Sequence, residues 1–360
     1  MEQKTENRKP ITSQLFGVPI SITSKIQALA LVGEWVMEYN SVIGSRLSVL
    51  GSQSIGFQSI GSKPANRKPA DQKQKTENRK QITGFPKLIV TPNPEMIVAA
   101  QSDPEFLKAL QSADLAISDG VGVVLALKLL GLKRPGLAKQ GQAFKRFSPL
   151  SGLDLMESLI AEAASQGWKV LLLGGKPGVA ERAAKIFQLS VLGSRSSVSG
   201  QSVLGLSVSE TGKLKTGKLE TENRKQKTDN RLQIQSINGP NNISSISKLD
   251  NDSFISQINS YSPDLLFVAF GHGKQEKWLT ANCYRLNVGV AMGVGGALDQ
   301  IADPSLRPPP YINSIGLGWL YRLFRQPWRW RRQIALVRFA GMVVLKILSH
   351  RHSGLDPESI

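Results

Sequence analysis

Short apolar runs alternate with amphipathic segments along most of the chain, and this alternation predicts its secondary structure. The apolar runs have the length of buried strands. The amphipathic segments carry apolar residues at three- and four-residue spacing, many after a Ser, Asp or Pro that favours a helix start. Strands are predicted at 13–20, 87–91, 114–118, 168–175, 264–270 and 288–296, and helices at 21–40, 94–101, 103–113, 122–131, 152–167, 177–188, 249–261 and 274–286, with another short helix after 296.

This order of elements predicts an α/β fold with a parallel sheet and helices on both faces. Strands that alternate with helices of ordinary length join in parallel, because each helix carries the chain back across the sheet. Ligands of such sheets bind beyond the carboxyl ends of the strands. Five of the predicted ends are rich in glycine and polar side chains: "TPNPEM", "SDGVG", "LGGKPG", "GHGKQE" and "GVGGALD".

Two internal segments, 41–84 and 190–248, do not follow this pattern. They repeat short pieces such as "TENRK" and "SVLG" and are rich in Ser, Gly, Gln, Asn and Lys. Such segments bury too little apolar surface to offset the entropy of ordering. We therefore expect disordered insertions, inert or partner-binding, within a core of residues 14–306. Residues 1–13 and 348–360 are expected to be disordered ends.

The amino-acid composition and charge limit the cellular location and the partners that we expect for this protein. The single cysteine, Cys283, excludes an internal disulfide framework and fits a reducing, cytoplasmic location. The polar start of the chain lacks a secretory signal, and its apolar stretches are interrupted by charges before reaching the length of a membrane span. The formal net charge of +18 resides mainly in the two insertions and in residues 307–351. The predicted core elements together sum to about −1, which argues against a nucleic-acid groove there.

Three strand ends carry the candidate chemistry, each with a plainer alternative. Gly174, Gly175 and Lys176 precede a predicted helix, where backbone N–H groups could bind phosphate or simply form a tight turn. Asp119 is either a general base or a helix cap. "TPNPEM" offers polar groups that also suit caps and turns. His272 is far in the sequence from His350 and His352 in the tail, so no metal cluster can be argued.

Taken in order, these segments resemble the WecG/TagA/CpsF family of bacterial glycosyltransferases. The resemblance rests on "FGVPI", "TPNPEM", "DPEF", "ADLAISDGVGVV", "SGLDLM", "LLLGGKPGVAE", "PDLLFVAFG", "KQEKW", "GVGGALD" and "GLGWLYRLFRQPWRWRRQ". It covers about 14–40, 85–188 and 249–347. It implies a Rossmann-like transferase that moves an N-acetylmannosamine-type sugar from a UDP donor to undecaprenyl-diphosphate-linked N-acetylglucosamine, for teichoic acids or related surface polymers. It also implies inversion at the anomeric carbon, no metal and no cofactor, and it is compatible with a homo-oligomer.

The resemblance assigns roles to individual residues. Asp119 matches the general base, and Thr91 and Asn93 match the polar pair beside it. Gln275 matches a glutamine near the substrate, and Glu276 is expected to hold its loop. The arginine expected at Pro149 is replaced, which leaves Arg146 as a substitute. The donor's phosphates and nucleotide are assigned to a larger set: Gly174, Gly175, Lys176, Gly295, Gly296, Arg322 and Arg325.

Residues 307–347 are predicted to form a basic, amphipathic helical appendage. Tryptophans interleaved with arginines suit a lipid headgroup boundary, and the resemblance implies peripheral attachment to the inner face of the cytoplasmic membrane. A solvated helix or an RNA-binding arm is the alternative. Gly318 stands where the family pattern has glutamate, so an inactive homologue that only binds nucleotide sugar is a further alternative. A nucleic-acid partner is not expected.

Overall fold

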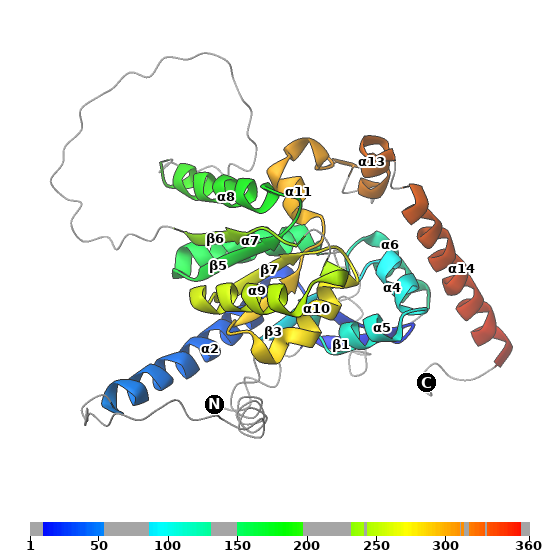
Figure 1. Ribbon diagram of the computed structural model, residues 1–360. Helices are drawn as coiled ribbons and strands as arrows, with labels where there is room; N and C mark the ends of the chain where they lie inside the picture. The colour runs from blue at the N-terminus through cyan, green and yellow to red at the C-terminus, as the bar shows by residue number, and fades with distance from the viewer. Residues whose placement is uncertain are drawn as a thin grey trace, which may run out of the picture.

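Six parallel strands form the central sheet in the computed structural model (Figure 1). The structure describes residues 10–53, 86–130, 150–196, 232–240, 243–309, 311–312, 317–327 and 330–353. The strand order is β4-β3-β8-β7-β5-β6, and every pairing in it is parallel. The strands are β3 (Lys87–Val90), β4 (Leu115–Ala116), β5 (Lys169–Gly174), β6 (Gln233–Ile237), β7 (Leu265–Ala269) and β8 (Val290–Gly293).

Helices cover both faces of the sheet, as the sequence predicts. Alternate residues of β5 show this, because Val170 and Leu172 belong to one apolar cluster and Leu171 and Leu173 to another. The first cluster includes α2 (Lys25–Gln53), α7 (Gly152–Gln166), α8 (Val179–Ser196) and α11 (Ala297–Ala302). The second includes α9 (Lys248–Tyr261) and α10 (Lys274–Asn282). The α/β prediction is confirmed.

A third apolar cluster lies at the β3–β4 edge of the sheet. It joins α4 (Pro94–Ala100), α5 (Pro104–Gln111) and α6 (Val121–Leu129) to a two-stranded antiparallel sheet, β1 (Ile11–Leu15) and β2 (Val18–Ile22). The single strand predicted at 13–20 was therefore wrong, because the chain turns back on itself at Phe16 and Gly17. Both residues have positive φ, which a tight hairpin requires.

Several predicted boundaries were also wrong. Strand β1 begins at Ile11, inside the expected disordered start, while α8, which continues to Ser196, and α14 (Trp330–Ser353) both end inside segments expected to be disordered. Helix α2 continues to Gln53 and so enters the segment assigned to the first insertion. Strand β6 lies inside the second predicted insertion and completes the sheet beside β5. Ile234 of β6 and Leu232 just before the strand are buried and alternate with glutamines, and the polar composition of the surrounding segment hid that period-two pattern. The greater part of both insertions lies outside the described residues.

The C-terminal segment contains α13 (Gly318–Arg325) and α14 (Trp330–Ser353). Helix α14 packs against α4, and its Phe339 and Val343 are buried in the third apolar cluster. The Phe339 ring also meets the Phe16 ring edge to face, with centroids 6.2 Å apart. Figure 1 shows α14 alongside α4. Among the described residues, no helix is long and apolar enough to cross a membrane.

Candidate active site

The polar ends of five strands open into one large cleft. Its volume is about 3540 Å³, and α7, α8, α13 and α14 contribute further walls. Residues from all five glycine-rich or polar segments line it, which is the arrangement expected where parallel strands end together. The predicted site residues that line the cleft are Thr91, Asn93, Asp119, Gly175, Lys176, Gln275, Gly295, Gly296 and Arg322.

Asp119 lies in the cleft wall between the end of β4 and the start of α6. Its backbone N–H donates to the Pro92 carbonyl (2.9 Å), which ties it to the neighbouring strand end. The next residue, Gly120, has φ of +91°, a conformation that lets the chain turn directly into α6. The Asp119 side chain thus occupies a fixed position at the mouth of the sheet.

The groups around Asp119 shift the pKa of its carboxyl in opposite directions. Burial raises the pKa of its carboxyl above the ordinary value, whereas the Arg322 guanidinium and a hydrogen bond from the Gly152 N–H lower it. The nearby Asp154 carboxylate adds a smaller rise. A carboxylate whose pKa is raised is a stronger base than an ordinary aspartate, so Asp119 is suited to take a proton from a hydroxyl group.

Thr91 and Asn93 lie on the adjacent strand end and have mainly structural contacts. The Asn93 side chain accepts a hydrogen bond from the Met96 N–H (2.9 Å) and caps α4. Thr91 packs so closely on Gly152 that a Cβ there would lie 3.0 Å from the threonine methyl. This contact brings the start of α7, and with it the Gly152 N–H, toward Asp119.

The residues assigned to phosphate binding in the turn after β5 lie in two different surroundings. Gly174, with φ of +104°, packs against β7, where an added Cβ would lie 2.8 Å from the Ala269 carbonyl oxygen. This close packing is by itself enough to require glycine at position 174. Gly175 and Lys176 line the cleft instead, together with Gly295 and Gly296 across the sheet.

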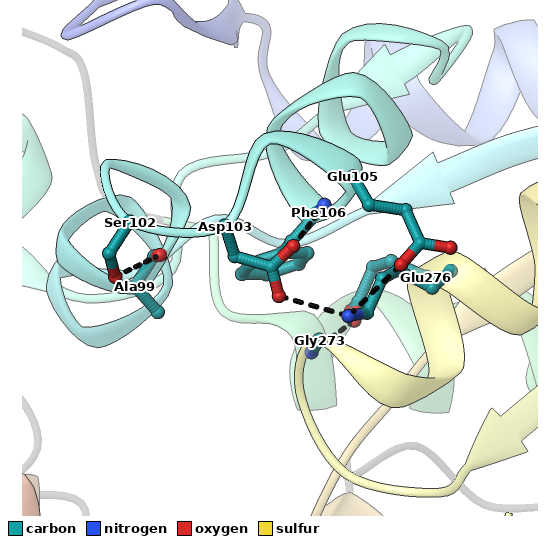
Figure 2. Close-up of polar contacts among 8 residues, drawn as sticks. Ala99, Ser102, Asp103, Glu105, Phe106, Gly273 and Glu276 are labelled. Carbon is teal, nitrogen blue, oxygen red and sulfur yellow. Dashed lines mark hydrogen bonds and ion pairs between the residues drawn. The ribbon is translucent and has the colours of Figure 1, made fainter. Parts of the chain in front are cut away.

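Gln275 and Glu276 form a buried hydrogen-bonded pair. Gln275 donates through Nε2 to Glu276 Oε1 (2.8 Å) and accepts through Oε1 from the Gly295 N–H (3.0 Å). Glu276 Oε2 accepts from the Gly273 N–H (2.7 Å), a contact drawn in Figure 2. These bonds link the loops after β7 and β8, so Gln275 holds the Gly295 turn in place as well as lining the cleft.

Figure 2 also shows how the start of α10 is held from the other side, where Asp103 and Glu105 of α5 face it. Lys277, the residue after Glu276, forms ion pairs with Asp103 (2.9 Å) and Glu105 (3.4 Å). The Asp103 carboxylate additionally caps α5 by accepting from the Phe106 N–H (2.9 Å). The start of α10, which carries Gln275, is thus anchored both to the start of α5 and to the Gly295 turn.

Glu276 should make stability depend on pH. Burial raises the pKa of its carboxyl from 4.5 to about 7. The folded state therefore holds this proton more tightly than the unfolded state, so the contribution is fully present below pH 4.5 and is lost as pH rises through about 7. We expect the free energy of unfolding to fall by up to about 3 kcal/mol over this range through Glu276.

Urea unfolding at pH 5 and pH 8 measures this effect. Glu276→Gln cannot titrate and should remove most of the pH dependence, although its amide places an N–H against one of two donors and lowers stability. Glu38→Gln, at an exposed carboxylate of α2, is the matched control and should keep the wild-type slope. An unchanged slope in Glu276→Gln would contradict the assignment.

The two arginines of α13 assigned to the donor's phosphates have different positions, because Arg322 lines the cleft and Arg325 does not. Arg322 lines it beside Asp119, and its buried Nε has no hydrogen-bond partner among the described residues. Arg325 instead donates to the Ser305 carbonyl oxygen through Nε (3.3 Å) and Nη2 (3.2 Å), which fastens α13 to the end of the core. Arg307 adds a two-bond ion pair to Glu157 of α7 (2.7 and 2.9 Å). Arg322 is therefore the better placed of the two to meet an anionic ligand.

The sequence matches a known protein family over most of its length. The model of the Glycosyl transferase WecG/TagA/CpsF family matches residues 70–199 and 216–353, well over half of the chain. The chain belongs to this family. Glycosyl transfer is accordingly its class of reaction.

Two curated relatives are similar to this WecG/TagA/CpsF glycosyltransferase over most of its length. Both are named N-acetylglucosaminyldiphosphoundecaprenol N-acetyl-beta-D-mannosaminyltransferase. The protein of Bacillus spizizenii strain W23 is 26% identical over 270 residues, which cover 75% of this chain and 81% of the relative. That of Bacillus subtilis strain 168 is 26% identical over 259 residues, covering 72% and 79%.

Some features of this glycosyltransferase site were not predicted from the sequence. The Gly152 N–H at Asp119 was missed, although Ser151, which caps α7 by accepting from the Asp154 N–H (3.1 Å), is a recognisable signal for a helix start there. Gln333 of α14 was also missed; it lines the cleft, and its buried Oε1 has no partner among the described residues. The predicted substitute Arg146 lies outside the described residues.

Proposed function

We propose that this glycosyltransferase moves N-acetylmannosamine from a UDP donor to the N-acetylglucosamine of a polyprenyl-diphosphate-linked acceptor. The observation that carries the proposal is Asp119, a partly covered carboxylate with a raised pKa, set beside Arg322 in a cleft made by strand ends. The names of both relatives support the choice of donor sugar and acceptor.

The proposed reaction is a single displacement. Asp119 takes the proton of the acceptor hydroxyl as that oxygen attacks the anomeric carbon of the donor sugar. The bond from the anomeric carbon to the UDP oxygen breaks, and UDP leaves with the electron pair. Arg322 lies close enough to Asp119 to act on the same reacting centre, where its charge offsets that of the leaving diphosphate. Attack from the face opposite the leaving group inverts the anomeric centre.

The rest of the donor is assigned to the loops across the cleft. Gly175 and Gly295 have positive φ and line the cleft, so backbone can approach a phosphate closely there, and Lys176 adds a positive charge. Gln275 and Glu276 hold the Gly295 turn in the required position. Thr91 and Asn93 shape the acceptor side beside Asp119.

A donor panel tests this proposal. The purified chain should release UDP from UDP-N-acetylmannosamine only when a diphosphate-linked N-acetylglucosamine is present, and should use UDP-N-acetylglucosamine and UDP-glucose at least about tenfold less well by kcat/KM. Binding of the donor without acceptor-dependent turnover would identify an inactive homologue. Tight, salt-sensitive RNA binding without turnover would instead favour a nucleic-acid function for the appendage.

We further propose that the appendage holds the enzyme on the inner face of the cytoplasmic membrane. Phe324, Trp330 and Val337 are 77%, 56% and 74% exposed on α13 and α14, beside basic residues of the same helices. Exposed aromatic and aliphatic side chains with neighbouring arginines favour an anionic lipid surface.

Vesicle sedimentation of the full chain checks the membrane proposal. Replacing Phe324, Trp330 and Val337 with serine should weaken binding to anionic vesicles at least about tenfold, because the apolar surface that enters the interface is lost. Ile26→Ser, at an 80% exposed position on α2, is the control and should bind as wild type does. Equal binding of both variants would contradict the role of α13 and α14.

A further inference from the structure

Helix α6 carries an exposed apolar stripe that begins beside Asp119. Val121, Leu125 and Leu129 are 47%, 52% and 56% exposed, although α6 also has a buried side. Their spacing of four residues places them on one face of the helix. All three line the cleft that contains Asp119. Large side chains left exposed at this regular spacing indicate a surface that receives an apolar partner.

Helix α14 supplies a second apolar row to the same cleft. Leu336, Ala340, Val344 and Ile347 line it at spacings of four, four and three residues, while Phe339 and Val343 anchor the helix in the core. Figure 1 shows α14 beside α4, against which it packs, and residues of both α6 and α14 line the cleft. The cleft therefore continues from its polar floor into a trough with apolar side chains from two helices.

We propose that this trough binds the first isoprene units of the acceptor's polyprenyl chain. The inference rests on the proposed function, because it extends the acceptor site from the sugar to the lipid. An acceptor of this chemistry presents, in order, a sugar hydroxyl, a diphosphate and an apolar chain. The cleft presents Asp119 for the hydroxyl and, starting two residues further along the sequence, the α6 stripe for the apolar chain.

The length of α6 suits this order. A helix rises about 1.5 Å per residue, so Leu125 and Leu129 lie roughly 6 and 12 Å along the axis from Val121, the first residue of α6. A hexose joined to a diphosphate is on the order of 10 Å long, because each covalent bond is about 1.5 Å. Val121 would then lie beside the sugar and diphosphate, Leu125 near the junction of the diphosphate with the chain, and Leu129 beside the chain.

Two acceptor analogues with the same sugar diphosphate test the proposal, one with a C5 and one with a C15 isoprenoid chain, each used below its micelle-forming concentration. The full-length wild-type chain should prefer the longer chain by about tenfold in kcat/KM, mainly through KM, because more apolar surface is buried. Leu125→Asn with Leu129→Asn should reduce this preference to about twofold or less, because the loss in kcat/KM falls mainly on the C15 acceptor, which buries more apolar surface. Leu249→Asn, at an 82% exposed position on α9, is the control.

The possible outcomes test the proposed transfer reaction and the binding of lipid in the trough separately. Turnover of neither acceptor by wild type would overturn the proposed function, and the trough with it. Turnover without a chain-length preference, or with a preference that the double variant keeps, would overturn the trough alone. Light scattering adds an independent reading: a wild-type dimer that the double variant dissociates would assign the stripe to contact between copies of this chain and overturn lipid binding.

Discussion

Asp119→Asn should lower kcat by about 10²- to 10⁴-fold, because the amide cannot accept the proton of the attacking hydroxyl. The substitution keeps the size of the side chain and removes a desolvated charge, so thermal stability should stay equal or rise. Steady-state transfer at saturating donor and acceptor measures the first effect, and a melting curve measures the second. Little change is expected in KM for the donor.

Glu162→Gln is the matched control, because this carboxylate also lines the cleft but lies on α7. It should retain wild-type kcat. Asp119→Asn with undiminished kcat would remove Asp119 from the mechanism. The proton would then have to leave by another route.

Arg322→Gln should lower kcat/KM by about 10²-fold, because a positive charge at the leaving diphosphate is lost from a partly buried site. It should also move the acid limb of the pH profile. Arg322 lowers the pKa of the Asp119 carboxyl, so its removal raises that pKa and the ionised base is present only at higher pH. The limb of kcat/KM against pH therefore shifts upward.

A pH profile separates this double role from a merely structural one. Arg338→Gln, an exposed arginine of α14, is the control and should leave both the height and the position of the profile unchanged. A uniform fall in Arg322→Gln with no displacement of the acid limb would contradict the electrostatic link between Arg322 and Asp119. An unchanged profile would contradict both roles.

The sequence predicted the part of the site that local pattern determines. Apolar runs ending in glycine and polar residues located the strand ends, and the topology of a parallel sheet then brought Asp119, Gln275 and Gly295 to one edge. The functional assignment of Asp119 came from the order of motifs, since a lone aspartate at a strand end is as easily a helix cap. The structure adds the groups that set its pKa.

Long-range contacts could not be predicted from pattern. Arg322 reaches Asp119 only because α13 is fastened to the core through Arg325 and Ser305, and no local signal gives that placement. Strand β6 was missed because its short alternation lies in a polar segment. Gln275 was predicted to contact substrate, and the structure shows that both ends of its amide are already bonded within the protein.

Gly318 illustrates how a departure from the family pattern can be interpreted once the fold is known. It begins α13, one helical turn before Arg322. A glutamate at this position would lie on the same side of the helix as Arg322 and compete for its charge. With glycine there, the Arg322 Nε is left without a partner among the described residues and is available to a ligand.

The most direct test of the account is the anomeric configuration of the product. The purified chain is incubated with UDP-N-acetylmannosamine and a diphosphate-linked N-acetylglucosamine acceptor, and the new glycosidic linkage is examined by proton and carbon NMR. A single displacement assisted by Asp119 predicts one disaccharide product whose new linkage has the configuration opposite to that of the donor. A product with retained configuration, or UDP release without any disaccharide, would contradict it.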